Sequence, residues 1–236
     1  MAAIALWETF SKFSPWIPSA VGVLRLVWEN LNSESFLFAV VGSLRRMVIG
    51  YCIVCTLGIG TGLALGRFRF LDDLLGTVAV AIHSMPGAAW VPLSILLFGF
   101  TESAVIFSIV LGATGIVMVH TSAGIKDVPP LILQAARTMG AKGAAMFWYV
   151  VVPAAIPRIV DGLRLAWAFG WRALMAGELL VASVYGMGKL LSEVAKKQQM
   201  HQLLAFMLII AVIGMLVDGL IFRRMEKSVR TRWGTA

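Results

Sequence analysis

Four stretches of the chain are apolar and almost free of charge over the length of a membrane-spanning helix. They cover residues 47–66, 74–100, 103–123 and 203–222, and Asp218 is the one charged residue within them. Because about 20 consecutive apolar residues cross the hydrocarbon core as a helix, each stretch predicts a transmembrane helix. The pattern therefore indicates a polytopic membrane protein.

Two further apolar stretches carry charges. Residues 13–28 contain Arg25, whereas residues 159–183 contain several ionisable side chains, among them Arg172 and Glu178. Their apolar lengths still favour spanning. We therefore expect an all-α fold of about six transmembrane helices, in one transmembrane domain that covers residues 1–236.

The stretch 74–100 is longer than a bilayer requires, and Pro86 and Pro92 lie inside it. Proline removes a backbone donor and clashes with the preceding helical turn, so this span is predicted to kink or break. Broken helices at membrane depth are tolerated where they face protein or a water-filled cavity. The break is therefore a candidate for a transport pathway.

Composition supports the membrane assignment, since 59% of the residues are hydrophobic and 14% are charged. Soluble domains average roughly 45–50% and 25%. The net charge of +8 comes from Lys and Arg placed between apolar runs, which indicates contact with lipid headgroups and a role in membrane topology rather than binding of nucleic acid.

Basic residues concentrate in four parts of the chain: the N-terminal segment, residues 67–73, residues 124–158 and the tail. Because basic residues favour the cytoplasmic side of a membrane, this distribution predicts cytoplasmic N- and C-termini. The two cysteines lie in one apolar run and indicate no metal site.

The longest connection between predicted spans covers residues 124–158. Pro129 and Pro130 favour the opening of a short helix over Leu131–Met139, and Gly140 is a suitable residue to end it. A second short helix is expected to stop before Pro153. Two short helices at the membrane surface are suited to docking into a groove on another protein, or to lying on the bilayer.

This connection resembles the EAA loop of bacterial ABC importer permeases, whose pattern is E-A-A-x3-G-x9-I-x-L-P. Gln134, Ala135, Ala136, Gly140 and Pro153 match its spacing, with Gln134 in place of the usual Glu. Other segments resemble the nitrate, sulfonate, taurine and bicarbonate branch of these permeases: Ser43-Leu44-Arg45-Arg46, Met85-Pro86, Trp90-Val91-Pro92-Leu93, Gly162-Leu163-Arg164 and Gly170-Trp171-Arg172 followed by Glu178.

The resemblance implies a type I importer permease in the bacterial inner membrane, with its coupling helices in the cytoplasm. Two permease copies, two ATPase subunits and an extracytoplasmic substrate-binding protein would form the complete transporter. Gln134, Ala135, Ala136, Gly140 and Pro153 would belong to the segment that couples to the ATPase. The chain has no G-x-x-x-x-G-K-[ST] phosphate loop, so we expect a partner to hydrolyse ATP, and we expect neither enzymatic activity nor a cofactor here.

Charged and aromatic side chains recur on one face of the predicted fifth span. At helical spacing, Asp161, Arg164, Trp171, Met175 and Glu178 share this face, and Arg172 lies at its edge. Small residues from Gly162 to Gly177 lie opposite and favour close helix packing. The charged face either lines a translocation path or forms ion pairs for packing.

Arg172 and Glu178 lie deeper in this span than Arg164. We predict that the Arg172 guanidinium attracts a small anion, because it offers paired hydrogen-bond donors to an oxyanion. Met85 and Trp90, beside the broken third span, are expected to form a gate on account of their position in the family.

The family resemblance and the arginines of the predicted path favour an importer subunit for a small anion of the sulfonate, taurine, nitrate or bicarbonate class. Two alternatives remain open at this point: a self-contained secondary transporter or channel, and a permease for a neutral or cationic vitamin precursor. A second, identical permease copy is the simpler expectation for the partner in the membrane.

Overall fold

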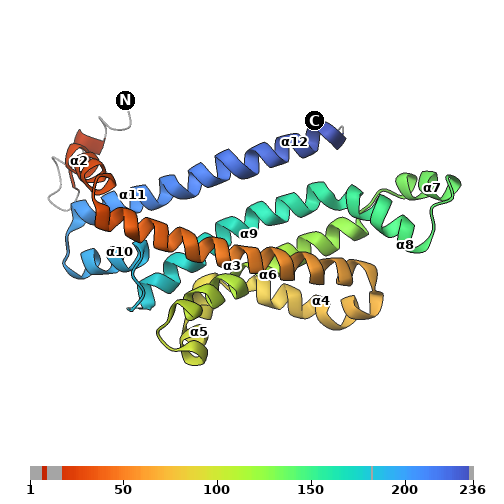
Figure 1. Cartoon of the computed structure of the whole chain (residues 1–236), viewed down its shortest axis with the longest axis horizontal. Coiled ribbons are helices and arrows are strands. Elements are labelled where there is room, and N and C mark those ends of the chain that lie inside the picture. The colour runs from red at the N-terminus through yellow and green to blue at the C-terminus, as the bar shows by residue number, and fades with distance from the viewer. Residues whose placement is uncertain (1–6, 10–17, 182, 234–236) are drawn as a thin grey trace.

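The computed structural model describes residues 7–9, 18–181 and 183–233, and these residues form helices and turns without a strand. The long helices lie side by side (Figure 1). The elements from residue 20 onward are α2 (Ala20–Leu31), α3 (Glu34–Arg67), α4 (Arg69–Ser84), η1 (Gly87–Trp90), α5 (Val91–Phe98), α6 (Glu102–Lys126), α7 (Pro130–Thr138), α8 (Gly143–Met146), η2 (Phe147–Val151), α9 (Val152–Leu180), α10 (Met187–Lys196), α11 (Met200–Val217), η3 (Asp218–Phe222) and α12 (Arg223–Trp233).

Four continuous helices in the described part of the chain are long and apolar enough to cross a membrane. They cover Glu34–Arg67, Glu102–Lys126, Gly143–Leu180 and Met200–Val229. A fifth crossing is formed if the bent pair Arg69–Ile82 and Gly87–Phe98 counts as one span, with a bend of 99° between its halves. The all-α membrane fold is thus confirmed, and so is the break predicted at Pro86.

The expected first span, residues 13–28, has no counterpart among the described residues, and its residues 13–17 lie outside them. The helix in this region, α2, begins after Pro18 and Ser19, and the Ser19 hydroxyl accepts a hydrogen bond from the Gly22 N–H at 3.2 Å. With twelve residues α2 is about 18 Å long, which is shorter than a hydrocarbon core of about 30 Å. The described chain therefore has up to five spans against the expected six.

Helix α6 lies between α3 and α9, and glycines on both neighbours allow close approach. A Cβ added to Gly62 of α3 would lie 2.5 Å from the Thr121 Cβ of α6, and one added to Gly162 of α9 would lie 2.5 Å from the His120 Cβ. Close contacts repeat along both interfaces, at 2.6 Å for Gly58 with Val117 and Gly66 with Ile125, and at 3.1 Å for Gly177 with Val105. The predicted small-residue stripe on the fifth span is therefore confirmed as a helix-packing face.

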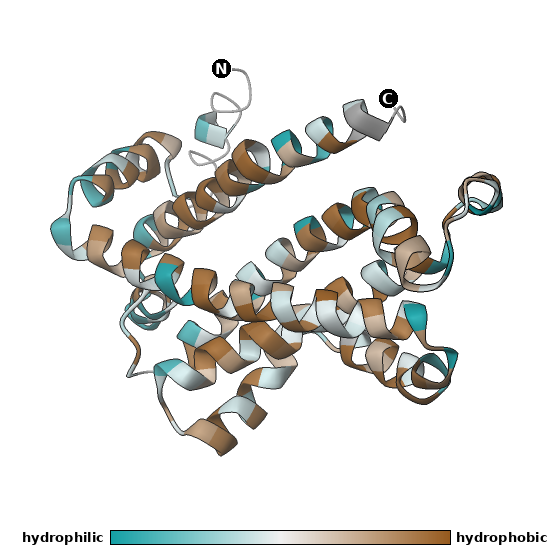
Figure 2. Ribbon diagram, turned by 45° about the vertical axis from the view of Figure 1, so that its right-hand side comes forward, coloured by the Kyte–Doolittle hydropathy of each residue, from teal (hydrophilic) through white to brown (hydrophobic). Residues whose placement is uncertain are grey.

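The two ends of the helix bundle carry different elements. Helices α2 and α10 lie at one end, while α7, α8 and the end of α12 lie at the other (Figure 1). Hydrophobic residues cover most of the long helices, and hydrophilic residues gather mainly near their ends and in the turns (Figure 2). The described segment near the N-terminus and the C-terminal helix are thus at opposite ends.

The expected connection 124–158 is shorter in the structure, because α6 continues to Lys126 and the next long helix starts at Gly143. The second short helix does not stop before Pro153, as the sequence had suggested. It continues through the π-helical segment η2 into α9, and Pro153 lies in the first turn of α9. Proline has no N–H and therefore leaves one backbone carbonyl of the preceding turn without its helical donor. A local π-helical turn can supply another donor to such a carbonyl, so the helix remains continuous.

Candidate functional site

Helix α7 ends as the sequence predicts. Gly140 follows it with a φ of +87°, a left-handed conformation that glycine adopts without a steric penalty. The Gly140 N–H donates to the Arg137 carbonyl and the Ala141 N–H to the Ala136 carbonyl, each at 3.0 Å. These hydrogen bonds close the end of the helix and reverse the chain sharply toward α8.

One face of α7 rests on the chain and the other is open. Ala136 is buried, whereas Gln134 and Ala135 are exposed. Leu131 and Met139, at the two ends of the helix, are 75% and 82% exposed. An apolar helix face without a partner inside the chain is typical of a surface that docks into a groove.

Pro153 connects this exposed segment to the bundle. It lies in the first turn of α9 and is partly buried. Helix α9 then runs without interruption to Leu180 at the opposite end. The residues from Gly143 to Leu180 thus form one continuous helix that follows α7 and reaches the opposite end of the bundle.

At the other end of α9, Glu178 is completely buried in a cluster of polar groups. Its Oε1 accepts hydrogen bonds from the Arg46 Nη2 at 2.7 Å and Nε at 3.0 Å. Its Oε2 accepts from the Ser43 hydroxyl at 2.8 Å and from the Gly188 N–H at 2.9 Å. Arg46 also pairs with Glu102 at 2.9 Å, so the cluster joins α3, α6, α9 and α10.

Two other residues of the predicted charged face pack against neighbouring helices of the same chain. Trp171 is buried and stacks on Trp167 with their ring centroids 6.4 Å apart. Met175 packs against the same core. Together with Glu178, these side chains are directed toward neighbouring helices of their own chain rather than toward open space.

Arg164 pairs with the last long helix. Its Nε and Nη2 donate to the two carboxylate oxygens of Asp218 at 2.7 and 2.8 Å, and its Nη1 donates to Glu226 at 2.8 Å. No partner for Asp218 can be assigned from the sequence, although an intramembrane carboxylate by itself signals a nearby cation. This bidentate pair fixes α9 to the end of α11 and to α12.

Arg172 is exposed on the surface of α9, unlike the other predicted path residues of this helix. It lies on an exposed stripe with Leu165 and Leu179, seven residues before and after it. Its guanidinium carbon is 5.2 Å from the centre of the Phe169 ring, and within the described residues no carboxylate forms an ion pair with it. An unpaired arginine in a membrane-spanning helix normally faces a cavity or another subunit.

The broken third span lies beside Arg172. A Cβ added to Gly87 in the bend would lie 2.9 Å from the Cβ of Ala173, the residue that follows Arg172. Met85 is exposed at the same bend, and the buried indole nitrogen of Trp90 has no hydrogen-bond partner in the described part of the chain. The structure thus places the bend between Met85 and Trp90 against the turn of α9 that contains Arg172, which sequence spacing alone did not establish.

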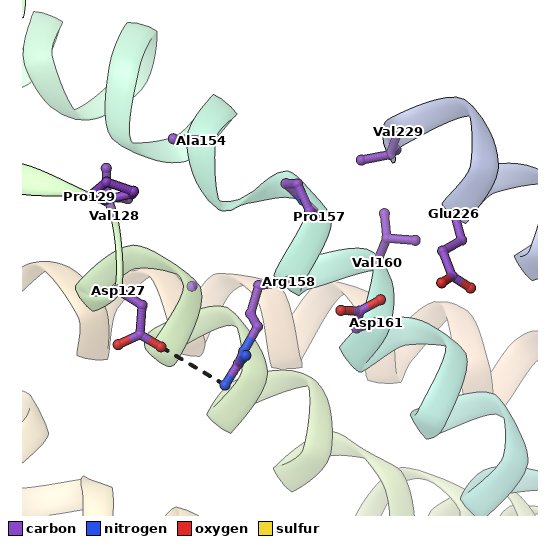
Figure 3. A pocket seen from close by; sticks show the side chains of 11 residues that line it. Asp127, Val128, Pro129, Ala154, Pro157, Arg158, Val160, Asp161, Glu226 and Val229 are labelled. Atoms are coloured by element: carbon purple, nitrogen blue, oxygen red, sulfur yellow. Dashed lines mark ion pairs between the residues drawn. The ribbon is translucent and has the colours of Figure 1, made fainter. Parts of the chain in front are cut away.

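A cavity of about 400 Å³ opens at the α7 end, between the end of α6, the start of α9 and α12 (Figure 3). Asp127, Arg158, Asp161 and Glu226 line it, and Arg158 pairs with Asp127 at 3.9 Å. Arg158 and Arg164, the two arginines nearest to Asp161 in the sequence, form ion pairs with other carboxylates. Among the described residues, no group of three His, Cys, Asp or Glu is placed to hold a metal ion.

The chain is similar in sequence to a family of membrane transport proteins and to proteins named as permeases. Residues 56–231 match the family described as binding-protein-dependent transport system inner membrane component. A protein of Methanocaldococcus jannaschii named as an ABC transporter permease is 31% identical over 223 residues, which are 92% of this chain and 84% of that protein.

Two relatives named after their substrates are similar over nearly as much of the chain. The bicarbonate transport system permease protein of Synechococcus elongatus is 25% identical over 91% of this chain and 82% of its own length. The taurine transport system permease protein of Escherichia coli is 28% identical over 89% of this chain and 78% of its own length.

The fold is similar to that of a solved permease. The inward-facing methionine ABC transporter MetNI superposes with a TM-score of 0.68 at 16% identity, covering 84% of this chain and 99% of that one. At 16% identity the match shows that the folds are similar and gives no information on the substrate. It agrees with the type I importer fold that the EAA-like loop implied.

Proposed function

The chain belongs to the family of binding-protein-dependent transport system inner membrane components, and we propose that it forms the path for a small oxyanion in an ATP-driven importer. Members of this family are membrane-spanning permease subunits, while a separate ATPase hydrolyses ATP and a binding protein delivers the substrate. The chain is therefore a transport subunit and not an enzyme.

The proposed coupling to the ATPase rests mainly on the exposed face of α7. Leu131 and Met139 are exposed apolar side chains on a short helix outside the bundle, with Gln134 and Ala135 between them. Gln134 retains the length and hydrogen-bonding capacity of Glu but carries no charge. Docking of α7 into the ATPase would therefore rest on apolar contact and neutral hydrogen bonds.

Arg172 supports the oxyanion proposal. Its guanidinium is exposed on α9 next to the break in the third span, and a planar array of donors suits sulfonate, nitrate or bicarbonate oxygens. The taurine and bicarbonate permeases among the relatives are consistent with this class. A second, identical copy facing this stripe would bring two Arg172 side chains to one path, with Met85 and Trp90 as its gate.

The proposal gives a structural role to four residues of the predicted path, which are Glu178, Trp171, Met175 and Arg164. Their side chains are occupied by contacts inside the chain, so they position α9 and do not touch the substrate. Arg172 then acts from a stretch of α9 that is held on both sides by ion pairs, at Arg164 and at Glu178.

The α7 end of the bundle is proposed to face the cytoplasm, because the ATPase binds there. This places the C-terminal helix α12 in the cytoplasm as well, as the distribution of basic residues predicted. Helix α2 lies at the opposite end. The Trp7 indole N–H donates to the Pro18 carbonyl at 3.1 Å, so the segment around Trp7 also lies at the α2 end. The proposal therefore places this segment on the extracytoplasmic side, whereas the sequence predicted a cytoplasmic N-terminus.

Affinity purification of the tagged chain from its native membranes tests the coupling proposal. We expect a phosphate-loop ATPase to be recovered in equal amounts, and we expect Ala135→Arg to abolish its recovery. Ala195→Arg, on the exposed face of the short helix α10 at the other end, is the matched control and should retain the ATPase. Recovery of the chain alone, with ATP-independent transport in proteoliposomes, would instead support a self-contained carrier.

Uptake by the reconstituted complex with its binding protein tests the substrate class. Labelled taurine, nitrate and bicarbonate are compared with a neutral and a cationic vitamin precursor. We expect uptake of one anion, a loss of at least about tenfold in Arg172→Gln, and partial retention in Arg172→Lys, which keeps the charge without the paired donors. Unchanged uptake and unchanged substrate-stimulated ATP hydrolysis in Arg172→Gln would contradict the proposed role of Arg172.

A further inference from the structure

A basic groove lies between α7, α8 and the end of α3. Its volume is about 530 Å³, within the range of small-molecule sites. Arg67 comes from the end of α3, Arg137 from α7 and Lys142 from the turn before α8. The groove is thus built by segments that are far apart in sequence, and it is distinct from the acidic cavity beside α12.

The positive charge in this groove is not balanced by acidic groups. Its lining contains Arg67, Arg137 and Lys142 but no Asp or Glu. Within the described residues, none of these three cations takes part in an ion pair. Three unpaired cations around one concave surface form an attractive site for an anion.

The rest of the lining is apolar. Met146, Phe147 and Val151 form one side of the groove. The guanidinium carbon of Arg67 is 5.6 Å from the centre of the Phe147 ring and 5.7 Å from that of Phe68. These aromatic faces hold the guanidinium by cation–π contact without using its N–H donors. A ligand that satisfies both sides of the groove must be anionic at one end and apolar at the other.

The surroundings place the groove at the level of a membrane–water interface. Arg67 is the last residue of the apolar helix α3. Trp148 and Tyr149, next to Phe147 in the chain, are 56% and 81% exposed. Exposed Trp and Tyr are characteristic of the headgroup region, where an amphipathic ring has both an apolar and a polar environment. An amphipathic anion that is abundant at this depth is a phospholipid.

We infer that this groove binds an anionic phospholipid, with its headgroup phosphate between Arg67, Arg137 and Lys142 and an acyl chain along Phe147 and Val151. The bound lipid would connect α3 to the α7–α8 segment. Docking of α7 would use its open face around Leu131 and Gln134, which do not line the groove. The inference concerns a lipid site and goes beyond the transport function proposed above.

Native mass spectrometry of the full chain in neutral detergent tests this site. The protein is titrated with dioleoylphosphatidylglycerol and, separately, with dioleoylphosphatidylcholine. We expect the first phosphatidylglycerol to bind at least about tenfold more tightly than phosphatidylcholine, since each cation near an anionic headgroup contributes about fivefold. The variant Arg67→Gln/Arg137→Gln/Lys142→Gln should lose this preference and retain phosphatidylcholine binding.

The matched control is Lys189→Gln/Lys196→Gln/Lys197→Gln, which removes three positive charges at the opposite end of the bundle. It should keep the preference. If the first triple variant does not fold, Arg137→Gln/Lys142→Gln changes only exposed side chains and should still lower the preference at least about fivefold.

Three results would overturn the inference. The first is equal affinity for the two lipids, and the second is an equal loss of preference in both triple variants, which indicates diffuse attraction. The third is release of the bound phosphatidylglycerol when the ATPase subunit is added, because a protein surface would then occupy the groove. None of these results would affect the coupling proposal, whose readout is recovery of the ATPase.

Discussion

Arg46 of α3 and Glu178 of α9 form an ion pair 2.7 Å long, in which the side chains are 2% and 0% exposed. The Glu178 carboxylate also accepts from Ser43 and from the Gly188 N–H, and Arg46 donates to the Tyr185 carbonyl. A buried charge pair is tolerated when hydrogen bonds satisfy its remaining donors and acceptors. The pair therefore holds α3, the end of α9 and the start of α10 in one arrangement.

Glu178→Ala is expected to destabilise the protein, because it leaves the Arg46 charge buried without its main partner. Removing one member of a buried pair costs about 3–5 kcal/mol. Thermal unfolding in detergent, followed by loss of monodisperse protein, measures this effect. Glu29→Ala, which breaks the exposed Arg25–Glu29 pair on α2, is the control and should change little. Equal stability of Glu178→Ala and the wild type would show that the cluster does not anchor the fold.

Asp218→Asn is expected to loosen α12 from α9, since Arg164 binds Asp218 through two hydrogen bonds. Hydrogen–deuterium exchange of the peptides from Arg223 onward should become faster. The exchanged pair Arg164→Asp/Asp218→Arg should restore much of the protection, whereas either reversal alone should not. Unchanged exchange in Asp218→Asn would mean that the Arg164–Glu226 pair and apolar packing are enough to hold α12.

Gly62→Ala is expected to push α3 away from α6. An added Cβ would meet the Thr121 Cβ at 2.5 Å and the Met118 carbonyl at 2.7 Å, and overpacking of this kind costs about 1–3 kcal/mol. Gly60, two residues earlier, has no atom within 4 Å of an added Cβ. Gly60→Ala should therefore leave thermal stability unchanged or raise it, since alanine is the better helix former. Equal effects of the two substitutions would argue against close α3–α6 packing.

Gly140→Val is expected to weaken coupling without preventing membrane insertion. A β-branched residue at a φ of +87° is strained by about 1–2 kcal/mol or more, and the reversal after α7 would change. Substrate-stimulated ATP hydrolysis by the reconstituted complex should fall, while the amount of the chain in the membrane stays the same. Gly140→Asn should be milder, because Asn tolerates left-handed conformations. A wild-type rate in Gly140→Val would show that the shape of this turn is unimportant for coupling.

Part of the site could be predicted from local sequence. The short helix after Pro130, the glycine that ends it and the break at Pro86 each depend on a few consecutive residues, and the structure contains all three. The charged face of the fifth span was harder to interpret. Helical spacing placed Arg164, Trp171 and Glu178 together, but it could not show whether their neighbours were other helices or a cavity.

Apolar run length, proline and glycine act within one helix or turn, so the order of residues alone is enough to establish an all-α membrane protein with an EAA-like loop. The pairing of Glu178 with Arg46 and of Arg164 with Asp218, and the exposure of Arg172 near the Pro86 break, emerge only when the helices pack together. These outcomes depend on which helix packs on which face of α9. The close contacts along α6 fix that arrangement, and they join residues separated by many positions in the chain.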